Sequence, residues 1–265
     1  MRLHVLGSGS KGNCAIVEAD DAALMIDCGL TRNAVRERMD AVGFDSSKIR
    51  GLLVTHEHAD HVKGIGVNLR GLGVEGELPI YCTAGTRGNV QYLSDYGNIV
   101  TIGAGDGFDV SGIHVDVFDI SHDAAEPVGF RLSCDGPSAG PRISTVGYMT
   151  DSGICTPMAR EMLSGCQVLA IETNHDSRML REGPYPAYLK RRIASDIGHL
   201  SNDKADSLLG QLACGDLGYV VGMHISQQNN DPRIPRELLS GTLRRLGLEA
   251  EVDIAAQNTP RSVGF

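Results

Sequence analysis

The chain has 265 residues, of which 42% are hydrophobic and 22% are charged, which is ordinary for a globular protein. This length predicts one large domain, residues 1–265, that can bury a full core, and no apolar run reaches the ~20 residues that a bilayer-spanning helix requires. The net charge of −9 argues against broad, non-specific coating of nucleic acid but leaves room for a local basic patch.

Short apolar runs bounded by turn residues dominate the first half of the chain and predict strands. In the segment "TRNAVRERMDAVGF", apolar residues fall at helical spacing between an N-cap at Thr31 and a stop at Gly43. Strands are predicted at residues 2–7, 14–19, 23–29, 51–55, 78–82, 98–102, 113–120, 127–134, 143–149, 168–174, 217–226 and 248–255. Helices are predicted at residues 31–44, 83–97, 158–165, 186–194, 202–215 and 233–247.

Strands and helices alternate in the second half, and no repeat or low-complexity linker interrupts the order. The Gly- and Pro-rich segment "CDGPSAGPRI", residues 134–143, fits a hairpin turn better than a domain boundary. We therefore expect an α/β (α+β) fold, in which two packed sheets carry helices on their outer faces.

The seven cysteines include no C-x-x-C pair, so we expect neither a disulfide framework nor a cysteine-based zinc site. Most of them lie in apolar runs, where a small buried side chain is the ordinary role. Reduced thiols, and an N-terminal segment without the layout of a signal peptide, indicate a cytoplasmic protein.

The segment "GSGSKG", residues 7–12, matches the G-x-G-x-x-G pattern of a dinucleotide site. Such a site needs a helix at the last glycine, but the next run, "CAIVEA", has only six residues and leads into another strand. We interpret the segment as a tight loop between antiparallel strands, whose N–H groups could face an anion. The side chains considered for contact with a substrate anion are Ser8, Ser10, Lys11 and Asn13. An ordinary role in forming the turn explains their presence equally well.

The segment "VTHEHADHVKG", residues 54–64, holds three of the nine histidines. His56 and His58 are two residues apart at a strand end, so extended backbone points both to one side. Asp60 and His61 follow where the chain is expected to enter a helix. The run thus offers two imidazoles to one ion, and a carboxylate with a third imidazole to a neighbouring ion. The alternative is a solvated, charged loop.

A pair of ions needs further ligands, and three candidates follow downstream. His122, Asp151 and His224 each stand at the C-terminal tip of a predicted apolar strand, where one shared sheet edge would bring them together. His4 and His114 lie inside predicted strands, and we interpret them as structural histidines.

The set "THEHADH", "SHDAAEPVG", "TDSG" and "HIS" resembles the metallo-β-lactamase-fold hydrolases. The resemblance implies a four-layer αββα sandwich with two divalent metal ions, Zn, Mn or Fe, at the sheet edge. Water between two such ions becomes a nucleophilic hydroxide near neutral pH. The implied ligands are His56, His58 and His122 for one ion, Asp60, His61 and His224 for the other, and Asp151 between them, with Asp60 also counted as catalytic.

Further motifs favour phosphodiesters among the substrates that this fold accepts. His199 in "GHLSN" resembles the additional histidine of ribonuclease Z-like phosphodiesterases, which can donate a proton to the leaving oxygen. Glu172 resembles the acidic partner that orients that histidine and keeps it protonated. The stretch "PYPAYLKRRI" mixes aromatic and basic residues and suits a phosphate backbone, although a solvated amphipathic helix is an equal alternative. The residues concerned are Tyr185, Tyr188, Lys190, Arg191 and Arg192.

Over essentially the whole chain, "GSGSKGN", "GPYP" and "GHLSN" are similar to the YycJ/WalJ-like subgroup of these metallohydrolases. That resemblance implies a 5′-to-3′ exonuclease acting on double-stranded DNA. "HISQQNN" departs from the charged version expected after His224, and neither His175 nor Asp176 has an assigned role. The alternatives are a small-molecule hydrolase of a cyclic phosphodiester, lactone or thioester, and a non-catalytic metal-binding protein. The identity of the metal and the oligomeric state do not follow from the sequence.

Overall fold

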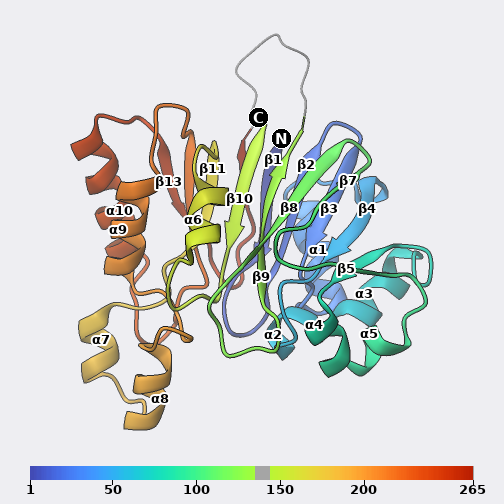
Figure 1. The fold of residues 1–265 in the computed structure, drawn as a ribbon, viewed down its shortest axis with the longest axis horizontal. Coiled ribbons are helices and arrows are strands. Elements are labelled where there is room, and N and C mark those ends of the chain that lie inside the picture. The colour runs from blue at the N-terminus through green and yellow to red at the C-terminus, as the bar shows by residue number, and fades with distance from the viewer. Residues whose placement is uncertain (135–143, 265) are drawn as a thin grey trace.

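The computed structural model describes residues 1–134 and 144–264, and its strands form two seven-stranded sheets packed face to face (Figure 1). The first sheet contains, in spatial order, β14 (Arg261–Gly264), β1 (Arg2–Gly7), β2 (Cys14–Ala19), β3 (Ala22–Ile26), β4 (Ile49–Leu53), β5 (Ile80–Cys82) and β6 (Ile99–Thr101). The second contains β13 (Glu251–Ile254), β12 (Tyr219–Met223), β11 (Val168–Glu172), β10 (Thr145–Met149), β9 (Val128–Ser133), β8 (Ile113–Asp119) and β7 (Gly107–Val110).

Helices cover the outer faces of both sheets, so the order of layers is αββα, as Figure 1 shows. Apolar residues of α1, α3 and α5 pack on the first sheet, and those of α6, α9 and α10 pack on the second. This arrangement confirms the expected fold class. The helices are α1 (Arg32–Ala41), α2 (Ala59–Val62), α3 (Ile65–Leu72), α4 (Ala84–Asn89), α5 (Gln91–Asp95), α6 (Pro157–Leu163), α7 (Ser177–Glu182), α8 (Ala187–Ile193), α9 (Asn202–Leu212) and α10 (Arg233–Leu246), with a short 3₁₀ turn, η1 (Ser46–Lys48).

The strands read as continuous apolar runs because both of their faces are buried. In β2, Ala15 and Val17 belong to the core between the sheets, whereas Cys14 and Ile16 belong to the core beneath the helices. All four side chains are fully buried. The alternation of a strand therefore separates two cores here rather than a core and a solvent face.

The structure differs from the predicted elements in several places. The predicted helix at residues 83–97 is two helices, α4 and α5, separated at Val90 with an extended φ of −123°. Gly88 and the β-branched Val90 are poor helix formers, which explains the break. The elements α3, α7, β7 and β14 were not predicted, because they are short and lie among turn residues. The hairpin turn predicted for residues 134–143 lies outside the described residues, apart from Cys134.

One edge of the sandwich collects the strand ends that carry polar residues. β3 and β4 are parallel, and so are β10, β11 and β12. β8 runs in the same direction as β10, because each pairs antiparallel with β9. The carboxyl ends of these strands therefore face one edge, and the two chain termini lie at the other (Figure 1).

Candidate metal centre

The histidine-rich loop follows β4 and continues into the short helix α2, as predicted for Asp60 and His61. Backbone hydrogen bonds fix the loop against neighbouring segments: Asn13 N–H donates to the Asp60 carbonyl at 2.8 Å, and Cys28 N–H donates to the His61 carbonyl at 2.7 Å. A Cβ atom at Gly29 would stand 1.6 Å from the Asp60 carbonyl oxygen, so only glycine fits there. The loop is thus held rigidly at the sheet edge.

Five non-glycine residues of the described chain adopt left-handed backbone: Asp20 and Ser111 lie in hairpin turns, and the other three follow strand ends at the edge that carries the histidines. Asp27, Asp151 and His224 have φ values of 57°, 55° and 51°. Non-glycine residues adopt this conformation at an energetic cost, and such residues cluster where the surrounding structure imposes a side-chain direction. All three are buried and face the histidine-rich loop.

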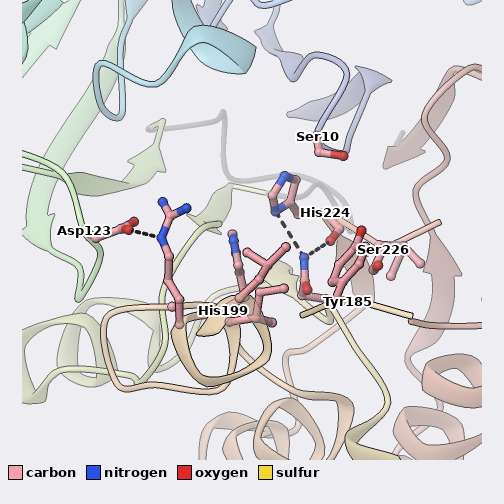
Figure 2. A pocket seen from close by; sticks show the side chains of 12 residues that line it. Ser10, Asp123, Tyr185, His199, His224 and Ser226 are labelled. Atoms are coloured by element: carbon pink, nitrogen blue, oxygen red, sulfur yellow. Dashed lines mark hydrogen bonds and ion pairs between the residues drawn. The ribbon is translucent and has the colours of Figure 1, made fainter. Parts of the chain in front are cut away.

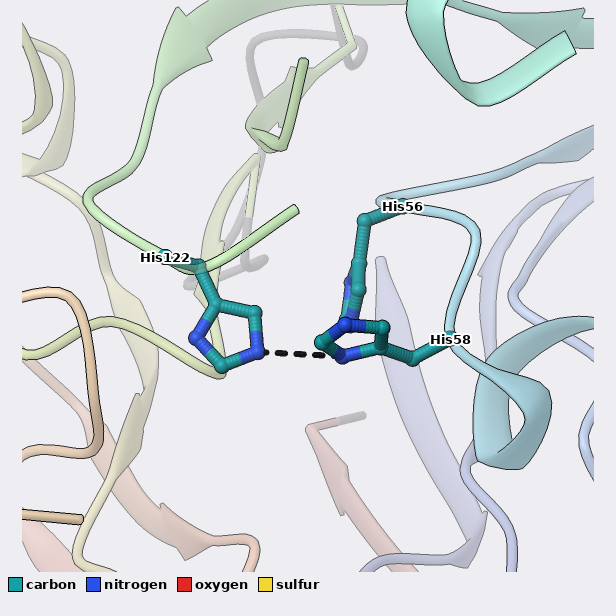
Figure 3. A group of neighbouring side chains, drawn as sticks. All are labelled: His56, His58 and His122. Carbon is teal, nitrogen blue, oxygen red and sulfur yellow. Dashed lines mark hydrogen bonds between the residues drawn. The ribbon is translucent and has the colours of Figure 1, made fainter. Parts of the chain in front are cut away.

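The first group of donors consists of His56, His58 and His122 (Figure 3). His122 Nε2 lies 3.2 Å from His58 Nδ1, while His122 Nδ1 donates to the Gly198 carbonyl at 3.1 Å. His56 Nδ1 lies 3.0 Å from the Thr55 hydroxyl, and its Nε2 is buried with no hydrogen-bond partner among the described residues. One nitrogen from each of the three imidazoles therefore faces a common point where a metal ion could bind.

The second group consists of Asp60, His61 and His224. His61 Nδ1 donates to Asp27 Oδ2 at 2.7 Å, which leaves His61 Nε2 directed toward Asp60 Oδ2, 3.6 Å away. His224 Nε2 also lies 3.6 Å from Asp60 Oδ2, and it is buried without a hydrogen-bond partner in the part of the chain that the structure describes. A carboxylate and two inward-facing imidazoles thus converge.

Asp151 lies between the two groups. Its Oδ2 is 3.2 Å from His61 Nε2 in the second group, and its Oδ1 is 4.0 Å from His122 Nε2 in the first. Burial lowers the pKa of His224, but Asp151, Asp60 and Glu172 together raise it to about 10. The negative charge of these three carboxylates would also stabilise a bound divalent cation.

The structure therefore brings all seven predicted ligands to one place. Buried histidine nitrogens without protein partners, next to carboxylate oxygens, are a donor set that suits divalent metal ions such as zinc, manganese or iron. His4 and His114 lie elsewhere: His4 contacts Ser262 and Glu18 within the first sheet, and His114 pairs with surface aspartates.

Glu172, which is fully buried, and His199, which is partly exposed, form a pair beside both donor groups. His199 Nδ1 lies 2.8 Å from Glu172 Oε1, while Glu172 Oε2 accepts the N–H groups of Ser152 and Leu200 at 3.0 and 2.9 Å. Burial raises the pKa of Glu172, but His199 and His224 outweigh it and lower the pKa to about 2. Burial likewise lowers the pKa of His199, but Glu172 and Asp151 raise it above its usual value. His199 therefore holds a proton more readily than a free imidazole does.

A cavity of about 180 Å³ opens beside His199 (Figure 2). His199 and His224 form one wall, and Tyr185 and Arg192 contribute side chains from the α7–α8 segment. Arg192 is exposed and donates from Nε to Asp123 Oδ2, as the dashed line in Figure 2 shows. An anionic ligand in this cavity would have a guanidinium and an aromatic ring within reach.

The residues predicted to contact substrate separate into two sets. Ser10 and Arg192 line the cavity. Ser8 and Asn13 differ from the expectation, because both are buried and occupied: the Ser8 hydroxyl accepts the His224 N–H at 2.7 Å, and Asn13 Nδ2 donates to Asp60 Oδ2 at 3.2 Å. They support ligands rather than face an anion. The remaining predicted contacts do not line the cavity: Lys11, Lys190 and Arg191.

Sequence reasoning missed two carboxylates and one hydroxyl at this centre. Asp27 is fully buried behind His61 and accepts hydrogen bonds from the Thr55 N–H and hydroxyl. Asp123 Oδ1 lies 3.4 Å from His122 Nε2 and has no hydrogen-bond partner among the described residues. Their positions in the sequence could have identified both carboxylates, since Asp27 follows an apolar strand directly and Asp123 adjoins His122. Asp176, which had no assigned role, caps α7.

The sandwich and its edge of histidines and aspartates define a metal-dependent hydrolase of the metallo-β-lactamase fold. The family model described as the beta-lactamase superfamily domain matches residues 23–225, and the chain belongs to this family. No helix in the described part is both long and apolar enough to cross a membrane.

Relatives with similar sequences are named as nucleases. Exodeoxyribonuclease YycJ of Bacillus anthracis is 33% identical over 254 residues, which cover 93% of this chain and 91% of that protein. Exodeoxyribonuclease WalJ of Streptococcus pneumoniae is 30% identical over 266 residues, covering 97% and 94%. Among solved structures, the metallo-β-lactamase fold protein YhfI of Bacillus subtilis has a TM-score of 0.71 at 16% identity and covers 99% of both chains, so it supports the fold alone.

Proposed function

We propose that the protein is a phosphodiesterase of DNA, a 5′-to-3′ exonuclease that acts on double-stranded DNA with two divalent ions. The names and nearly full-length similarity of YycJ and WalJ support the nuclease activity. The observation that carries the proposal is the pairing of His199 with Glu172 beside both donor groups, at the wall of a cavity that also holds Arg192. A site that only stores metal needs no such hydrogen-bonded histidine beside its ligands.

In this proposal the seven predicted ligands hold the ions: His56, His58, Asp60, His61, His122, Asp151 and His224. Divalent ions held there would lower the pKa of bound water and neutralise charge on the phosphodiester.

The side chains around the ligands have separate roles. Glu172 fixes the His199 ring through Nδ1, so that Nε2 remains available to protonate the leaving oxygen. Arg192 would hold a phosphate oxygen of the strand, and Tyr185 would stack on a base.

A second candidate is a hydrolase of a small cyclic phosphodiester, lactone or thioester. The modest volume of the cavity, about 180 Å³, and the net charge of −9 favour it. The Glu172–His199 pair serves a small phosphodiester equally well, so the length of the substrate distinguishes the two candidates.

The test is a substrate panel with Mn²⁺-loaded protein. Duplex DNA labelled at the 5′ end should release labelled mononucleotide at once, whereas a 3′-labelled duplex should shorten progressively. Bis-p-nitrophenyl phosphate should turn over slowly, and EDTA should abolish every reaction. Turnover of a thioester, a lactone or a cyclic phosphodiester with no cleavage of DNA would overturn the nuclease proposal.

A further inference from the structure

A second cavity, of about 620 Å³, lies beside the histidine-rich loop, between residues 29–33 and residues 63–70. Arg32, Lys63 and Arg70 line it, and no carboxylate does. These three side chains are exposed, so the cavity is a groove open to solvent. We call it the Arg32 groove. A cationic groove is notable in a chain whose net charge is −9.

The floor of the Arg32 groove is joined to the metal centre. Gly29 N–H donates to the Asn13 carbonyl at 2.8 Å, and Asn13 N–H donates to the Asp60 carbonyl at 2.8 Å. Gly64, two residues after the end of α2, donates to the Cys28 carbonyl at 2.9 Å. The groove therefore shares its supporting backbone with the loop that carries Asp60 and His61.

A contact between Lys63 and the Lys11 backbone links the groove with the loop that borders the cavity at His199. Lys63 Nζ donates to the Lys11 carbonyl at 2.9 Å, which brings two lysines of distant segments together at the surface. Ser10, the neighbour of Lys11, lines the cavity beside His199. The loop that carries Ser10 and Lys11 therefore borders the cavity on one side and contacts Lys63 of the Arg32 groove on the other.

The acidic residues near the groove neutralise little of its charge. Glu75 pairs with Arg70 at 2.9 Å, but both side chains are exposed, by 38% and 54%, and exposed pairs are weak. The first turn of α1, which borders the groove, contains no acidic residue. A polyanion that spans several positive side chains fits this surface better than a single small anion does.

We propose that the Arg32 groove binds the phosphate backbone of the DNA duplex beyond the phosphodiester that is cut. The inference rests on the proposed nuclease function and extends it to a surface outside the reaction centre. Lys and Arg contacts to phosphates supply sequence-independent affinity, as an enzyme that degrades DNA of any sequence requires. Because Arg32 and Arg70 touch no metal ligand, they affect how long DNA is held and leave the bond-breaking step unchanged.

The test compares two double charge reversals, Arg32→Glu with Arg70→Glu in the groove and Arg160→Glu with Arg244→Glu as the control. Arg160 and Arg244 are exposed on α6 and α10, over the other sheet, so both variants have the same net charge. In the groove variant, kcat/KM on a duplex longer than one helical turn should fall at least tenfold. Its turnover of bis-p-nitrophenyl phosphate should stay within twofold of that of the wild type.

Equilibrium binding of the same duplex, measured by fluorescence anisotropy at several salt concentrations, tests the groove's contribution to DNA affinity independently of catalysis. Loss of two phosphate contacts should reduce the slope of log affinity against log salt by about 1.8 in the groove variant only. Equal binding by the groove and control variants would overturn the inference. If the wild-type protein binds duplex through the groove but cuts no DNA, the proposed function fails while the groove stands. Arg32→Gln with Arg70→Gln replaces the reversal if that variant does not fold.

Discussion

The two groups of donors at the metal centre differ in what stands behind their imidazoles. In the second group, the buried carboxylates of Asp27 and Glu172 accept from His61 and His224, at 2.7 and 3.0 Å. In the first group, the acceptors are neutral: the Thr55 hydroxyl behind His56 and the Gly198 carbonyl behind His122. Each group includes one partly buried ligand, His58 in the first and Asp60 in the second.

A carboxylate behind a histidine fixes the ring and makes its other nitrogen more basic, so the ligand binds metal more tightly. We therefore expect the ion at Asp60, His61 and His224 to be retained more strongly than the ion at His56, His58 and His122. The difference teaches that the hydrogen bonds behind the ligands, and not the ligand types alone, distinguish the two groups.

The largest effect is expected from a substitution that disrupts both groups of ligands at once. Asp151→Ala takes away the carboxylate that faces both groups, so both ions should be lost, and activity should fall by more than the roughly 100-fold typical of an outer-layer change. Metal analysis by mass spectrometry, with DNA cleavage on the same sample, measures this. A variant that still binds two ions at wild-type strength would contradict the position between the groups.

His199→Gln should reduce kcat by about 10²- to 10⁴-fold, because it removes the proposed proton donor and no predicted ligand. The His199 ring centroid lies 5.3 Å from that of His122 and 5.2 Å from that of His224, so it adjoins both groups equally. Metal content should stay at the wild-type level for both ions. His114→Gln, on the surface, is the matched control; loss of metal in His199→Gln would show that His199 is a ligand.

Asp27→Asn sharpens the comparison by removing the charge behind His61 while keeping its shape. Metal affinity of the second group should fall about 10- to 100-fold, and that of the first group should change little. Calorimetric titration of Mn²⁺ or Zn²⁺ into metal-free protein resolves the two binding events. If both binding events weaken equally, the hydrogen bond between Asp27 and His61 does not account for the difference in metal affinity between the two groups.

Thr55→Val should have the smallest effect, because a neutral hydrogen bond contributes only about 1 kcal/mol, or roughly a factor of five in affinity. The weakened event should be the one assigned to His56. The same titration measures it, and Thr55→Ser, which retains the hydroxyl, should behave like the wild type. A loss as large as that of Asp27→Asn would show that Thr55 acts mainly through Asp27, to which its hydroxyl also donates.

The two sheets and the candidate ligands could be predicted from local sequence patterns. The alternation of apolar runs and turns indicated two sheets, and seven candidate ligands were visible because each follows a strand end or lies in one short loop. The prediction of one helix at residues 83–97 was wrong at Val90, because the helical spacing of apolar residues continued across residues with poor helix propensity. The sequence left the roles of Ser8 and Asn13 open between substrate contact and turn chemistry, because a polar residue in a glycine-rich loop looks the same whether it faces solvent or supports a ligand.

By itself, then, the sequence predicted two packed sheets and a cluster of ligand-type residues at strand ends, because side-chain periodicity and strand ends are properties of neighbouring residues. The family followed from the resemblance of its motifs. Only the tertiary structure decided what stands behind each ligand. Asp27 meets His61 across 34 positions, and Ser8 meets His224 across 216. The Arg32 groove likewise joins cations from separate helices and loops. Contacts of that range depend on which strands become neighbours and on how the two sheets pack, and no local pattern encodes them.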